Sequence, residues 1–61
     1  MKIEIWPQYS DALLLESIRQ EIVYNGRAMS GPEIVEMSRR SGHPVLKVRE
    51  IADREAKVIL Q

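Results

Sequence analysis

Glycine and proline punctuate this chain of 61 residues so closely that only short helices and strands fit between them. Glycine adopts the left-handed backbone conformation that ends many helices, and proline interrupts both helices and sheets, so each predicts a boundary. The total length allows one small domain, which we expect to cover residues 1–61. The boundaries lie at Pro7, Gly26, Gly31-Pro32, Gly42 and Pro44.

The segments before Gly26 predict a strand followed by a helix. Residues 2–6, Lys-Ile-Glu-Ile-Trp, alternate polar and apolar side chains and end at Pro7, which is typical of a short half-buried strand. Ser10 or Asp11 can then cap a helix that Asn25-Gly26 ends. The apolar side chains of this helix recur at spacings that place them on one face: Leu14, Leu15, Ile18 and Ile22.

Two further helices are predicted on either side of Gly42. In Ser30-Gly31-Pro32-Glu33 the serine and the glutamate three residues later fit a capping box, and proline needs no hydrogen bond in a first helical turn. This second helix ends at Gly42, and Pro44 opens the third. The apolar side of the third helix carries Val45, Val48, Ile51 and Ala52.

The end of the chain predicts a second strand. Residues 57–60, Lys-Val-Ile-Leu, are rich in β-branched side chains and could pair with residues 2–6. Each strand would then provide hydrogen-bond partners for the backbone groups at the edge of the other. The expected fold is therefore mainly α, with a three-helix core and short N- and C-terminal strands.

Positive charge is concentrated in one part of the chain. Nine basic and nine acidic side chains give a formal net charge of zero. A basic segment on an otherwise acidic small domain favours a surface that meets phosphates, although chance clustering on a solvated surface would look the same. Residues 37–49 contain no acid and hold Arg39, Arg40, His43, Lys47 and Arg49.

The small size predicts self-association. A chain of this length buries only about 60% of the surface that its unfolded form exposes, and without cysteine it has neither disulfides nor a thiolate metal site to support it. We therefore expect a homodimer. The longest apolar run, residues 12–15, cannot span a membrane, and residues 1–6 do not read as a signal peptide, so a cytoplasmic location is expected.

The order of the helices, with a short second helix and a sharp turn before a longer third one, is that of a helix-turn-helix. Residues 18–26 and 30–35, from Ile18-Arg19 to Gly26 and from Ser30 to Val35, resemble the winged helix-turn-helix domains of the SOS repressor and the biotin repressor. There an isoleucine-rich first helix ends at a glycine, and Glu-Ile-Ala opens the second helix. The resemblance implies a DNA-binding regulatory or accessory protein that is not an enzyme and binds double-stranded DNA through its third helix.

The positions of the basic segment within this arrangement indicate which residues contact DNA. Residues at the start of the third helix would face base edges, and residues at the end of the second would meet phosphates. The chain departs from the family late in the second helix, where Ser38 and Arg39 replace the usual leucine and glycine, so Met37 must supply the packing. The first set is His43, Leu46, Lys47 and Arg49, and the second is Arg39, Arg40 and Ser41.

The sequence predicts no catalytic, metal or cofactor site. His43 is the only histidine, cysteine is absent, and no glycine-rich phosphate loop is present.

Two other functions stay open. A protein-binding module, such as an inhibitor or assembly factor, would set the basic segment against an acidic protein surface. Residues 30–38 are also similar to the small helical-hairpin aspartyl-phosphate phosphatases of sporulating bacteria. In that family an acid stands where this chain has Gly42, and Pro44 would interrupt the family's long second helix.

Overall fold

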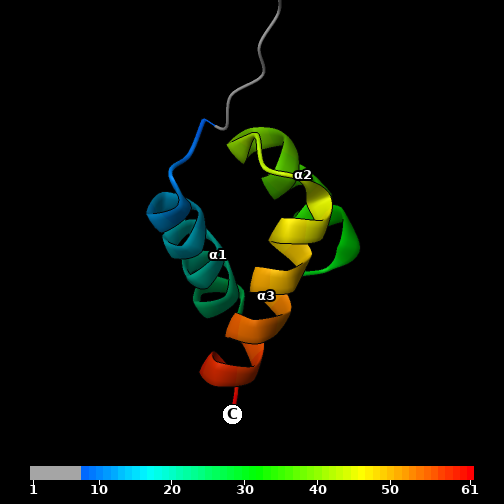
Figure 1. Ribbon diagram of the computed structural model, residues 1–61. Helices are drawn as coiled ribbons and strands as arrows, with labels where there is room; N and C mark the ends of the chain where they lie inside the picture. The colour runs from blue at the N-terminus through cyan, green and yellow to red at the C-terminus, as the bar shows by residue number, and fades with distance from the viewer. Residues whose placement is uncertain (1–7) are drawn as a thin grey trace, which may run out of the picture.

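The computed structural model describes residues 8–61, which form three helices (Figure 1). Helix α1 spans Asp11–Asn25, α2 spans Gly31–Ser41 and α3 spans Val45–Ile59. Helix α3 packs against both other helices, and it runs side by side with α1 in the same direction. Within residues 8–61, no helix has the length and apolar character needed to cross a membrane. The predicted three-helix core is confirmed.

Helix α1 begins and ends where the sequence predicts. Ser10 is the N-cap, and its hydroxyl oxygen accepts a hydrogen bond from the backbone N–H of Leu13 at 3.1 Å. Gly26 ends the helix with φ +68°, and its N–H donates to the carbonyl oxygen of Ile22 at 2.8 Å. Because this φ lies in the left-handed region, glycine is the residue that fits best at the position.

Helix α2 also follows its predicted boundaries. The carboxylate of Glu33 accepts the backbone N–H of Ser30 at 2.8 Å, which is the glutamate half of the predicted capping box. At the other end Gly42, with φ +79°, donates its N–H to the carbonyl oxygen of Ser38 at 2.9 Å. Pro44 then precedes the first residue of α3, so a new helix begins after a connection of residues 42–44.

The predicted C-terminal strand is wrong, because α3 continues through Ile59. The backbone N–H of Leu60 still donates to the carbonyl oxygen of Ala56 at 2.9 Å, and Ile59 packs against the core. Strand propensity at Val58 and Ile59 yields to these contacts, since a β-branched residue loses only a few tenths of a kcal/mol, roughly, in a helix. Residues 8–61 contain no strand, and the predicted strand over residues 2–6 lies outside the described residues.

The core lies between the three helices. The buried leucine and two isoleucines of α1 pack with Ile34 and Met37 of α2 and with the small apolar side chains of α3. Burial of each large side chain stabilises the fold by roughly 1.5–3 kcal/mol. Met37 fills the position predicted for it, with 1% of its surface exposed. The nine buried apolar residues are Leu14, Ile18, Ile22, Met29, Ile34, Met37, Val48, Ala52 and Ala56.

Candidate nucleic-acid interface

The end of α2, the connection over residues 42–44 and the start of α3 form a helix-turn-helix unit. The left-handed backbone of Gly42 reverses the chain, and Pro44 is the N-cap of α3. In Figure 1 the two helices diverge from this turn at the end of the molecule opposite the C-terminus. The basic segment of the sequence is thus divided between two helix ends that face different directions.

Two arginines of the basic segment are exposed, and within residues 8–61 neither forms an ion pair with another helix. Arg39 pairs with Glu36 of its own helix, at 3.3 Å, and surface pairs of this kind contribute about 0–1 kcal/mol. Arg49 is exposed and forms no ion pair with any residue of the range 8–61. Both guanidinium groups are therefore available to an anionic partner.

A shallow groove lies between α2 and α3 beside Arg49. Its volume is about 210 Å³, and Ile34 lines it together with the more exposed Val35 and Val45. Gly31 and Arg49 complete the lining. Leu46 is also exposed, so the predicted base-reading end of α3 is apolar rather than polar.

The first turn of α3 has no side-chain cap. Ser10 caps α1 and Glu33 contributes to the cap of α2, whereas the N-cap of α3 is Pro44, whose side chain accepts no hydrogen bond. The first hydrogen bond within α3 runs from the N–H of Val48 to the carbonyl oxygen of Pro44 at 3.1 Å. The amides of the preceding turn carry partial positive charge, which favours an anion at this end.

The outer face of α3 beyond its first turn carries mixed charge. Glu50 and Asp53 are both exposed, at the positions one and two turns after Leu46, and Lys57 follows on the same stripe. Carboxylates repel phosphates at short range. The two acids therefore separate the first turn of α3 from the next cation of this stripe.

Ser41 and His43, which the sequence predicts at the DNA surface, are buried, with exposed fractions of 0% and 5%. The carbonyl oxygen of Ser41 accepts the N–H groups of Gln8 and Tyr9, at 2.8 and 3.2 Å. The Nε2 atom of His43 lies 2.8 Å from the carbonyl oxygen of Tyr9. These hydrogen bonds form a clasp between residues 8–9 and the turn. Because the side chains of Ser41 and His43 are buried there, neither can contact a duplex.

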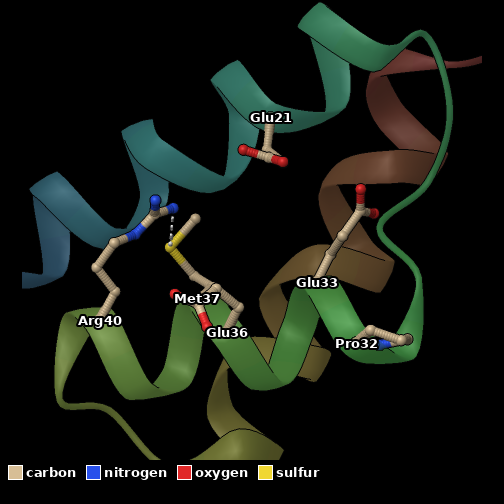
Figure 2. A pocket seen from close by; sticks show the side chains of 6 residues that line it. All are labelled: Glu21, Pro32, Glu33, Glu36, Met37 and Arg40. Carbon is tan, nitrogen blue, oxygen red and sulfur yellow. Dashed lines mark hydrogen bonds between the residues drawn. The ribbon is translucent and has the colours of Figure 1, made fainter.

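Arg40 and Lys47 are directed toward α1. Lys47 donates to the carboxylate of Asp11 at 2.9 Å, and this hydrogen bond, with the charge of Lys47, lowers the pKa of Asp11. Figure 2 shows Arg40 reaching toward α1, with one nitrogen 3.9 Å from the sulfur of Met37. The seven predicted contact residues are thus divided: Arg39, Leu46 and Arg49 are exposed, Ser41 and His43 are buried, and Arg40 and Lys47 are directed toward α1.

The cleft beside Arg40 holds three carboxylates. It has a volume of about 220 Å³ and is lined by Glu21, Glu33 and Glu36 as well as Arg40 (Figure 2). A two-point interaction at 3.0 Å with Arg27, aided by the backbone N–H of Ser30, lowers the pKa of Glu33 to about 2. Arg27 and Arg39 pair with two of these three carboxylates, so together with Arg40 the charges balance and this cleft offers phosphates no excess of positive charge.

Sequence reasoning missed part of this arrangement. The burial of Ser41 has a signal, because residues 34, 37 and 41 fall on one helical stripe with two apolar members. The contact between His43 and Tyr9 has none, since it joins residues 34 positions apart. The groove beside Arg49 depends on the angle between two helices, which no local pattern specifies.

Among residues 8–61, no three histidine, aspartate or glutamate side chains converge to hold a metal ion. Comparisons of the chain with protein-family models, with curated proteins and with solved structures gave no match. The functional argument therefore depends on the geometry of the site alone.

Proposed function

We propose that this protein binds double-stranded DNA through the exposed face of its helix-turn-helix, as a regulatory or accessory factor without enzymatic activity. The observation that carries the proposal is the pair of exposed arginines, Arg39 in the last turn of α2 and Arg49 near the start of α3, together with the uncapped first turn of α3. Arginine and a helix N-terminus are both groups that proteins use to contact phosphates. The proposal includes the expected cytoplasmic location, in a cell whose DNA is accessible from the cytoplasm.

The proposed contacts differ from those expected from the sequence. Arg39 and Arg49 each meet a phosphate, the first turn of α3 lies against the backbone, and Leu46 lies closest to the base edges. An apolar residue in this position discriminates bases mainly by contact with the thymine methyl group. Binding is therefore expected to depend strongly on salt and weakly on sequence.

The number of phosphates sets the expected salt dependence. Two arginines per chain release about two counterions, which gives a slope of log affinity against log salt of about −2 for one chain and about −4 for two. Fluorescence anisotropy with a random-sequence duplex, over a series of salt concentrations, measures this slope directly.

A matched pair of double variants tests the assignment. Arg39→Ala/Arg49→Ala removes the two outward cations, whereas Arg40→Ala/Lys47→Ala removes the two directed toward α1. Both lower the charge by the same amount in the same segment. We expect the first to reduce the slope by about 2 per chain and the second to leave it nearly unchanged. Equal losses in both variants, in folded protein, would show that overall charge rather than this face governs binding.

A protein partner is the second candidate, and the groove beside Arg49 favours it. Val35, Val45 and Leu46 expose apolar surface around a single guanidinium, which suits an acidic and apolar polypeptide segment. Absence of DNA binding at low salt, in a folded sample, would favour this function over the first. Affinity capture with the Val35→Glu variant as the control would then be the next experiment.

A further inference from the structure

Helices α1 and α3 share a face that points away from α2. Arg19 of α1 and Glu55 of α3 join the two helices at 3.1 Å, and Arg54 lies 3.6 Å from the same carboxylate. Val23 follows Arg19 by one helical turn, and Val58 follows Arg54 by one turn. We call this surface, with Glu16 one turn before Arg19, the α1–α3 face.

The two valines of the α1–α3 face are among the more exposed apolar residues of the described chain. Val23 is 62% exposed and Val58 is 61% exposed. Each lies one helical turn beyond an arginine of the ion-pair cluster, so both are placed toward the same end of the α1–α3 face.

Arg19 and Glu55 pair with each other across the α1–α3 face, and the two further charges, Glu16 on α1 and Arg54 on α3, are of opposite sign. Glu16 of α1 is exposed and its carboxylate accepts a hydrogen bond from Gln20, whereas Arg54 of α3 keeps most of its side chain in solvent. Because α1 and α3 run in the same direction (Figure 1), a two-fold axis that lies in this face along the helices would set α1 of one copy beside α3 of the other, in parallel. Such a contact is isologous, so Glu16 of each copy meets Arg54 of the other and the pair forms twice.

The face formed by α2 and α3 lacks this property. Its exposed apolar residues Val35 and Val45 are accompanied by Arg39 and Arg49, one arginine from each helix. A second copy placed there by a two-fold axis would bring cations together, which opposes association. The α2–α3 face therefore suits an anionic partner, and the α1–α3 face suits a copy of itself.

We propose that two copies of this chain associate through the α1–α3 face, with Val23 and Val58 buried in the contact and Glu16 opposite Arg54 of the other copy. A domain of 61 residues buries a smaller share of its surface than larger domains do, so burial of apolar area in a partner adds stability that it otherwise lacks. The association leaves the helix-turn-helix face of each copy open.

The oligomeric state of the whole chain tests the proposal. Sedimentation equilibrium of the wild type is expected to show a concentration-dependent dimer, and Val58→Glu is expected to weaken it by about 30-fold or more, since the substitution acts at both symmetric positions. Val35→Glu is the matched control, because Val35 is 54% exposed but lies on the other face. A monomeric wild type at about 1 mM, or equal weakening by both variants, would overturn the proposal.

Charge reversal tests the pairing in a way that a folding defect cannot imitate. Glu16→Arg and Arg54→Glu are each expected to weaken the dimer by about tenfold, and the double variant is expected to restore it to within about threefold of the wild type. Circular dichroism confirms that each variant keeps its helices. A double variant weaker than both single variants would refute the proposed contact. None of these measurements contains DNA, so their outcome is independent of the proposed DNA binding.

Discussion

Gly26 and Gly31 form a matched pair of test sites, because a methyl group added at either position meets no atom within 4 Å. They differ in backbone conformation. Gly26 has φ +68°, whereas Gly31 is the first residue of α2 and lies outside the left-handed region. Substitution of each by alanine therefore isolates the conformational contribution from any steric clash.

The two substitutions are expected to act in opposite directions. Alanine in the left-handed conformation costs roughly 1–2 kcal/mol, so Gly26→Ala destabilises the protein by about that amount. Alanine at Gly31 restricts the unfolded chain without strain and stabilises by roughly 0.4–1 kcal/mol. The variants thus differ by about 1.5–3 kcal/mol, a large part of the roughly 3–9 kcal/mol expected for a domain of this length.

Urea unfolding followed by circular dichroism gives both free energies. For a domain of this size 1 kcal/mol corresponds to a shift in Tm of roughly 4–8 °C, so thermal unfolding should separate the two variants by at least about 6 °C. Stability changes of the same sign and size in both variants would refute the reasoning, because they would show that the left-handed geometry at Gly26 is not maintained in solution.

Two further predictions concern the cap of α2 and the core. Because the pKa of Glu33 is lowered to about 2 from 4.5, its carboxylate stabilises the folded state above pH 4.5 and this contribution disappears as the pH falls toward 2. Glu33→Gln should therefore be less stable than the wild type at pH 7 and equally stable near pH 2 in urea unfolding, and a difference independent of pH would contradict the assignment. Ile18→Ala, at a fully buried position, should cost about 2–5 kcal/mol. Leu46→Ala, at a position 75% exposed, should stay within about 0.5 kcal/mol in the same assay, and comparable losses at the two sites would place the core elsewhere.

Helix boundaries could be predicted from the sequence because their causes are local. Ser10, Ser30 and the two left-handed glycines act within four residues of themselves, so each leaves a signature in the amino-acid order. Residues 57–60 could not be assigned in this way. Their helical state depends on the packing of Ile59 against the core, a tertiary contact that outweighs β-propensity.

The candidate site was harder to predict than the fold, because the number of charged residues in a segment does not say in which direction each side chain points. Arg39 and Arg40 are adjacent, yet successive residues of a helix point about 100° apart, so one faces solvent and the other the cleft between α1 and α2. Periodicity could have placed Ser41 in the core. For Lys47 the deciding contact is Asp11, which only the packing of α3 against α1 brings within reach.

The clasp between residues 8–9 and the turn after α2 has a consequence for the order of folding. The contact of His43 with Tyr9 closes a ring of chain 34 residues long that contains all of α1 and α2. Closing a flexible ring of that size costs about 3 kcal/mol of chain entropy, which the few hydrogen bonds of the clasp do not offset by themselves. The ring therefore closes only after hydrophobic packing has brought the helices together, and the clasp is a late product of folding rather than its nucleus.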